Sequence, residues 1–143
     1  MTKIVIFGGE SDIASAIKEI EPNTINISYA ECDVTDSNSI RECLEHHQPT
    51  AVVNCAGVSN VQLIKDSDIE LWEKEINVNL IGSYRIAREC ANLGIMDMVF
   101  IASVAGKYGK PEHSGYCASK CGTISLVQSL AFEGYNAYAV SPG

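Results

Sequence analysis

Residues 3–14, KIVIFGGESDIA, decide the fold, because they join a buried strand to a helix through a glycine turn. The β-branched apolar run at residues 3–8 ends in glycine and predicts a buried strand. The apolar side chains at positions 13, 14, 17 and 20 have helical spacing, and a polar capping region precedes them. We therefore expect a strand, a tight turn and then a helix over residues 12–20.

The same alternation continues outward from this stretch. Further strands are expected at residues 24–29, 51–54, 98–103 and 136–140. Helices are expected at residues 36–47, 67–93 and 116–132, the second of them broken or bent around residues 77–82. Strands that alternate with helices form a parallel sheet with helices on both faces. We therefore predict one α/β domain over residues 1–143, a Rossmann-like doubly wound sheet that binds its ligands at the carboxyl ends of the strands.

Composition narrows the function classes. The chain of 143 residues is 46% hydrophobic and 20% charged, which is ordinary for a globular protein with a buried core. A formal net charge of −8 argues against nucleic acid or an anionic membrane as a partner. No apolar run approaches the length of a membrane span, and the start MTKIVIFGG enters a strand directly. We interpret the chain as a cytoplasmic protein.

Six cysteines lie at positions 32, 43, 55, 90, 117 and 121, and none forms a CxxC pair. They fall inside expected strands and helices, so we interpret them as reduced thiols and not as disulfide or zinc ligands. His46 and His47 end a helix, where positive charge suits the helix dipole, so capping is favoured over metal binding. No metal site is predicted.

Unusual residues follow the ends of the expected strands. They are residues 8–12 after the first strand, Asp33 and Val34 near the second, residues 54–57 after the next, Ser103, and Pro142 with Gly143. The first loop leads into a helix N-terminus, whose free backbone N–H groups and positive dipole suit a pyrophosphate. Its sequence GGESDIA departs from the pattern G-x-G-x-x-G, so this loop alone is weak support for a dinucleotide site.

Tyr116 and Lys120 stand four residues apart in an expected helix, which puts both side chains on one face. A free phenol titrates near pH ~10, and a neighbouring cation favours the phenolate. Such a phenol can give a proton to a substrate oxygen, or take one from it, as hydride transfer requires.

Three further segments complete a pattern: Asn-Cys-Ala-Gly at 54–57, Asn-Val-Asn-Leu at 77–80 and Ile-Ala-Ser-Val-Ala-Gly at 101–106. With Tyr116 thirteen residues after Ser103, the chain resembles the short-chain dehydrogenase/reductase family, especially its 3-oxoacyl reductase-like members. The resemblance runs from Lys3 to Gly143. It implies an oxidoreductase that transfers a hydride between a nicotinamide cofactor, NAD or NADP, and a small alcohol or carbonyl substrate.

The resemblance also implies a role for each matched residue. Tyr116 would be the general acid/base, and Lys120 would lower its pKa and hold the nicotinamide ribose. Ser103 would hydrogen-bond the substrate oxygen, and Asn79 would hold a water that relays protons to Lys120. At the pyrophosphate, the cofactor would be surrounded by residues Gly8 to Ile13, which include Ser11 and Asp12. Asp33 and Val34 would meet the adenine, and Asn54, Ala56 and Gly57 would line the nucleoside side. Pro142 and Gly143 would lie near the nicotinamide.

The chain departs from the family pattern in four places. Asp12 and Ala14 replace the second and third glycines of the usual loop, and Asp12 brings negative charge toward the pyrophosphate. The stretch 20–33 is too short for a further helix, so the adenine side is expected to be abbreviated. Tyr138 stands where the family has Asn. The sequence stops at Ser-Pro-Gly, so we expect that the C-terminal part of the family's domain is missing and that strand 136–140 is a sheet edge.

Two other functions remain open. One is a sugar-nucleotide epimerase or dehydratase of the extended relatives, against which the segments 54–57 and 103–106 speak. The other is a non-catalytic nucleotide-binding protein, which the altered glycine loop favours and the intact catalytic set opposes.

Because Glu10 and Glu31 lie near the expected ribose and no Lys or Arg stands in either loop, we lean toward NAD over NADP. Apolar helices at 80–90 and 121–132 predict a homodimer or homotetramer.

Overall fold

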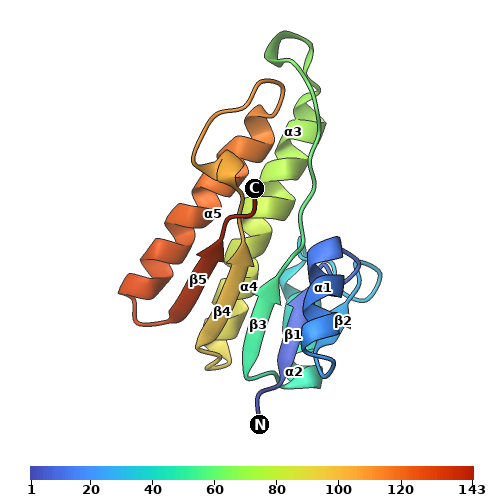
Figure 1. Ribbon diagram of the computed structural model, residues 1–143, viewed down its shortest axis with the longest axis vertical. Coiled ribbons are helices and arrows are strands. Elements are labelled where there is room, and N and C mark those ends of the chain that lie inside the picture. The colour runs from blue at the N-terminus through green and yellow to red at the C-terminus, as the bar shows by residue number, and fades with distance from the viewer.

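The computed structural model describes residues 1–143 and contains a five-stranded parallel sheet (Figure 1). In chain order its strands are β1 (Ile4–Phe7), β2 (Ile25–Ile27), β3 (Ala51–Asn54), β4 (Asp97–Ile101) and β5 (Asn136–Val140). Their spatial order is β2-β1-β3-β4-β5, and every neighbouring pair is parallel. The strand order reverses between β1 and β3, which is where doubly wound sheets bind ligands. The predicted Rossmann-like fold is confirmed.

Five α-helices connect the strands, namely α1 (Asp12–Ile20), α2 (Ser37–His47), α3 (Ile69–Glu75), α4 (Gly82–Asn92) and α5 (Ser114–Phe132). A π-helical segment, η2 (Ile76–Ile81), joins α3 to α4 and accounts for the bend expected around residues 77–82. Two short 3-10 turns are η1 (Ile64–Asp66) and η3 (Val104–Gly106). None of these helices is long and apolar enough to cross a membrane.

The two faces of the sheet are covered unequally. On one face Val5, Phe7, Val52, Met98 and Phe100 form the main core with buried side chains of α2, α4 and α5. On the other face a small cluster of Ile6, Val53 and Ala14 packs beneath α1. Helices therefore lie on both faces, as predicted, but α1 alone covers the second face, and only near β1 and β3.

The elements begin at residues whose chemistry sets the boundary. Ser11, Asp36 and Asp68 accept backbone N–H groups at the starts of α1, α2 and α3. The strand expected at 24–29 is shorter, because the carbonyl of Ser28 accepts the N–H groups of Glu31 and Cys32 and turns the chain away from the sheet. From there the chain reaches α2 by turns alone, so the adenine side is abbreviated as expected. The last helix starts two residues before the predicted Tyr116, and β5 is the sheet edge that the sequence predicted.

Candidate active site

The loop after β1 is packed tightly against the loop after β3. Gly8 has a φ of 68°, and a Cβ built on it would overlap the backbone of Cys55 and Ala56. Glycine is therefore required here both for its backbone conformation and for the close approach. Ser11 follows and caps α1 by accepting the N–H of Ala14 at 3.1 Å. The N–H groups of Asp12 and Ile13 belong to the first turn of α1 and have no partner inside the helix.

The turn after β2 fixes two carboxylates. Asp33 accepts the backbone N–H of Thr35 at 2.9 Å and its hydroxyl at 2.7 Å, and these bonds hold the pKa of Asp33 below its ordinary value. Glu31 folds back onto Ser28, accepting its N–H at 2.7 Å and its hydroxyl at 2.8 Å, which likewise lowers the pKa of Glu31. Both carboxylates are therefore held in the ionised form.

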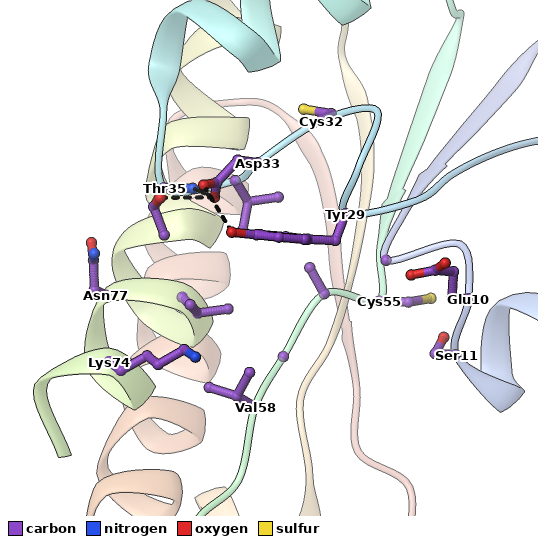
Figure 2. Close-up of a pocket in the computed structure, with 15 residues that line it drawn as sticks. Glu10, Ser11, Tyr29, Cys32, Asp33, Thr35, Cys55, Val58, Lys74 and Asn77 are labelled. Atoms are coloured by element: carbon purple, nitrogen blue, oxygen red, sulfur yellow. Dashed lines mark hydrogen bonds between the residues drawn. The ribbon is translucent and has the colours of Figure 1, made fainter. Parts of the chain in front are cut away.

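A pocket of about 580 Å³ lies at the carboxyl ends of β1, β2 and β3, within the range of small-molecule sites (Figure 2). Of the residues predicted to meet the cofactor, it is lined by Gly8, Ser11, Asp33, Val34, Ala56 and Gly57. Asp12 and Ile13 are exposed at the start of α1, outside this lining.

Asn54 does not line the pocket, contrary to the prediction, because its side chain is buried beneath it. Its Oδ1 accepts the N–H of Ala56 at 3.0 Å, and its Nδ2 donates to Ser83 at 3.1 Å. Asn54 therefore supports the loop after β3 from below and holds Ala56 in place at the pocket surface.

Glu10 also lines the pocket and lies inside the predicted stretch 8–13, whereas eight lining residues were not among the predicted cofactor contacts: Tyr29, Cys32, Thr35, Cys55, Val58, Lys74, Asn77 and Val78. Figure 2 shows the Tyr29 ring reaching across the pocket toward Asp33, with the two oxygens 3.5 Å apart. Lys74 and Val78 come from α3 and η2 and form the opposite wall. Their spacing of four residues was a signal in the sequence for a shared helix face.

Lys120 is the buried cation of the site. Its side chain on α5 is 6% exposed, and Nζ donates to the carbonyl of Ile101 at 2.8 Å. The same atom lies 5.6 Å from the centre of the Tyr116 ring, so the two side chains share a face as predicted. Burial lowers the pKa of the Lys120 ammonium group, while the charge interaction with Cys55 opposes this shift.

Ser103 lies at the end of β4, two residues after the carbonyl that binds Lys120. Its Oγ accepts the N–H of Ala105 at 3.1 Å, which starts the turn η3. The next residue, Val104, donates its N–H to the carbonyl of Pro142 at 3.1 Å, so residues 142–143 run beside Ser103. Ser103, Lys120 and Pro142 are thus grouped at the carboxyl ends of β4 and β5.

Asn79 is buried in η2 and binds the loop after β3 through both ends of its amide. Oδ1 accepts the N–H of Val58 and Nδ2 donates to its carbonyl, each at 2.8 Å. Nδ2 also donates to Ser119 on α5 at 3.1 Å. Gly57 separates Asn79 from Lys120, since a Cβ on Gly57 would lie 3.3 Å from Oδ1 and 3.6 Å from Nζ. Gly57, which lines the pocket, therefore lies next to both of these side chains.

The model of the short chain dehydrogenase family matches residues 1–143, the whole chain. The chain belongs to the short-chain dehydrogenase family. It is 36% identical over 126 residues to the 3-oxoacyl-[acyl-carrier-protein] reductase MabA of Mycobacterium tuberculosis, covering 79% of this chain and 51% of that protein. It is 30% identical over 133 residues to the (3R)-3-hydroxyacyl-CoA dehydrogenase of Homo sapiens, covering 82% and 51%. The chain thus spans about half the length of these curated relatives.

Solved structures of short-chain dehydrogenases and related enzymes share the fold. The ligand-free aldohexose dehydrogenase of Thermoplasma acidophilum superimposes with a TM-score of 0.85 at 23% identity, over 99% of this chain and 66% of that one. A 4-hydroxyisoleucine dehydrogenase complexed with NADH superimposes with a TM-score of 0.84 at 26% identity, over 100% and 75%. This short-chain dehydrogenase thus contains all four residues that were predicted as catalytic, namely Asn79, Ser103, Tyr116 and Lys120.

Proposed function

We propose that the protein is an NAD(P)-dependent oxidoreductase that transfers a hydride between a nicotinamide cofactor and an alcohol or carbonyl group. The observation that carries the proposal is the position of Lys120. Its ammonium group is buried beside Tyr116 and donates to the carbonyl of Ile101, two residues before Ser103. It also lies next to Gly57, which lines the 580 Å³ pocket. A proton-transfer group and a nucleotide-sized pocket therefore adjoin one another, as in the sites of acid/base oxidoreductases.

The residues of the pocket fit the adenosine half of a dinucleotide. The ionised Asp33 is an acceptor for an exocyclic amine, and Val34 and Ala56 offer apolar surface to a base. The first turn of α1 presents the N–H groups of Asp12 and Ile13 for a pyrophosphate. The residues beside Ser103, Pro142 and Gly143, would border the nicotinamide. When bound, the cofactor supplies or accepts the hydride.

In this proposal Tyr116 exchanges the proton with the substrate oxygen. Lys120 is the neighbouring cation, buried and with its Nζ 5.6 Å from the centre of the Tyr116 ring. Ser103 uses its Oγ to accept from Ala105 and keeps its hydroxyl hydrogen for the substrate oxygen. Asn79 has a second lone pair on Oδ1 beyond its bond to Val58, which can hold the water that relays protons to Lys120.

We further propose that NAD is preferred to NADP. Glu10 lines the pocket, and the carboxylate of Glu31 occupies the Ser28 N–H at the end of β2, where a ribose would lie. A 2′-phosphate at this position would meet negative charge. The cation that lines the pocket, Lys74, belongs to the opposite wall on α3. The charge distribution at the β2 end therefore favours a ribose diol.

Substrate, assembly and location complete the proposal. The relatives named 3-oxoacyl reductase and hydroxyacyl-CoA dehydrogenase support a small carbonyl or hydroxyl compound as substrate. A homodimer or homotetramer would cover the exposed apolar side chains on the helical face, which include Ile81, Tyr84 and Phe132. We propose a cytoplasmic location, and the acidic composition supports a protein that binds neither nucleic acid nor an anionic membrane.

The proposal is tested by mixing the full-length protein with NADH or NADPH and a panel of carbonyl compounds that includes 3-oxoacyl thioesters, ketoses and simple ketones. Oxidation of the reduced cofactor by at least one class is expected. The non-catalytic alternative would be favoured if the protein bound the reduced cofactor but oxidised it with none of the carbonyl compounds, and if it also failed to catalyse the reverse reaction.

A further inference from the structure

The helix that carries Tyr116 and Lys120 has no cap of its own. The helices α1, α2 and α3 each begin with a side chain, from Ser11, Asp36 and Asp68, that accepts a backbone N–H of the first turn. The residue before α5, His113, makes no such bond, and the first turn of α5 has no acidic side chain. A 19-residue helix with its positive end uncompensated thus begins two residues before Tyr116.

A buried carboxylate from a different helix lies against this first turn. Glu75, the last residue of α3, is 1% exposed and takes part in neither of the two ion pairs of the structure. A Cβ built on Gly115, the second residue of α5, would overlap Glu75 Oε2. One turn earlier on α3, Trp72 donates its Nε1 to the hydroxyl of Ser114 at 3.1 Å. Thus α3 holds the first two residues of α5.

The same carboxylate also fixes the loop after β3. Oε1 of Glu75 accepts the backbone N–H of Asn60 at 2.6 Å, and the Asn60 side chain donates to the carbonyl of Leu71 at 3.4 Å. Two residues earlier in this loop, Val58 is held by both ends of the Asn79 amide. Glu75 therefore connects the loop beside Asn79 with the turn that precedes Tyr116.

An ionised carboxylate is costly to bury without a cation, and the positive end of a helix reduces that cost. We propose that Glu75 caps the catalytic helix from α3 and is a positioning residue for Tyr116. It acts through the first turn of α5 and does not touch the substrate. Its consequence for the reaction rests on the proposed function of Tyr116, whereas its effect on the helix start does not.

The helix start is tested by amide hydrogen exchange in the full-length protein. Glu75→Ala removes the carboxylate, and Glu75→Gln keeps an acceptor for Asn60 but no charge. Glu73→Gln, on the exposed side of α3, is the matched control for loss of one negative charge. Amides of residues 114–117 are expected to exchange about fivefold faster in Glu75→Ala, by an intermediate factor in Glu75→Gln, and at the wild-type rate in Glu73→Gln. Wild-type exchange in both Glu75 variants would overturn the cap.

Turnover of a carbonyl found in the panel tests the positioning role. Glu75→Ala is expected to lower kcat by roughly one order of magnitude, with Glu75→Gln between it and the wild type, because a small displacement of an acid/base group is costly. The dissociation constant of NADH should change far less than kcat, since the Glu75 side chain itself does not line the pocket. Faster exchange with an unchanged kcat would overturn the positioning role. If the wild type turned over no carbonyl, the proposed function would fail while the exchange experiment still decided the cap.

A reciprocal variant covers the case in which Glu75→Ala does not fold. Gly115→Ala inserts a methyl group into the space of Glu75 Oε2 and should speed exchange of the same amides. Combining it with Glu75→Gln should not relieve the overlap, whereas combining it with Glu75→Ala should. Equal exchange in Gly115→Ala and in the wild type would show that the carboxylate does not press on this turn.

Discussion

Lys120 links the end of a strand to the proposed proton-transfer site through a single side chain. Its ammonium group has three hydrogens, and one of them is used by the carbonyl of Ile101 at the end of β4. In the proposed function, the remaining two hydrogens are available to the Tyr116 phenol and to a ribose hydroxyl. The bond to Ile101 thus orients the cation without saturating it, and it does so two residues from Ser103.

In the proposed function, cofactor preference depends on two residues, Glu10 and Glu31. We predict that the full-length protein binds NADH about tenfold more tightly than NADPH, because a phosphate near these carboxylates would be repelled. Glu31→Gln combined with Glu10→Gln should narrow the difference, and Glu42→Gln, an exposed change on α2, should not. Side-by-side fluorescence titrations measure both ligands. Tenfold tighter binding of NADPH by the wild type would contradict the charge argument.

The sequence was informative about residues with distinctive side-chain chemistry and less informative about residues that only line the pocket. Tyr116 and Lys120 share a helix face because their spacing of four residues requires it. Asn54 was assigned to the pocket from the family resemblance of residues 54–57, yet strand alternation turns its side chain inward, toward Ser83. Tyr29 and Lys74 reach the pocket from elements whose packing no local pattern specifies.

At the scale of elements, the turn η3, which begins after Ser103, lies directly on α5 at Lys120. Gly106 makes this approach possible, since a Cβ there would come within 2.8 Å of the Lys120 carbonyl. The neighbouring Gly109 has open space around its Cα. The two glycines therefore differ in what they do, although they stand three residues apart in one loop.

We predict that Gly106→Ala lowers the free energy of unfolding by about 1–3 kcal/mol, because backbone must shift to admit the methyl group. It should also lower kcat, since Ser103 begins the same turn. Gly109→Ala is the matched control and should stay within about 0.5 kcal/mol of the wild type. Chemical denaturation of the three proteins gives the comparison. A Gly106→Ala variant as stable as Gly109→Ala would show that η3 does not press on α5.

Element boundaries followed the sequence where a capping residue marks them. Ser11, Asp36 and Asp68 are all N-cap residue types, and α1 begins at the expected residue while α2 and α3 begin one and two residues after the expected positions 36 and 67. The start of α5 was placed at Tyr116 and lies at Ser114, because its positive end faces Glu75 of another helix and no local signal precedes it. The end of β2 was missed since the turn at residues 28–32 outweighs the strand-like alternation.

In the molecule as a whole, helices cover one face of the sheet, and the other face is largely uncovered. α2, α4 and α5 cover the main core, whereas Val99, Ile101, Tyr138 and Val140 alternate toward the side that carries only α1 (Figure 1). Tyr138 is 62% exposed on this side. Apolar side chains are also exposed on α4 and α5. The uncovered sheet face and the face formed by α4 and α5 are therefore two candidate surfaces for contacts between copies of the chain.

We predict that the full-length protein is a homo-oligomer that associates through the helical face. Tyr84→Glu on α4 should shift it toward the monomer, because a charge in an apolar contact must be desolvated. Tyr138→Glu on β5 is the control and should leave the mass unchanged. Light scattering at micromolar concentration reports the mass of each. A monomeric wild type, or an oligomer that dissociates only with Tyr138→Glu, would contradict this arrangement.

The central claim is that the chain brings a proton-transfer phenol to a nucleotide pocket, and Tyr116→Phe tests it most directly. In the full-length protein this variant should lower kcat by about a thousandfold, while NADH binds within about threefold of the wild-type dissociation constant. Tyr108→Phe, an exposed tyrosine in the preceding loop, is the matched control and should retain activity. Single-turnover oxidation of bound NADH by a carbonyl substrate measures the step itself. A Tyr116→Phe variant that oxidises NADH at the wild-type rate would contradict the account.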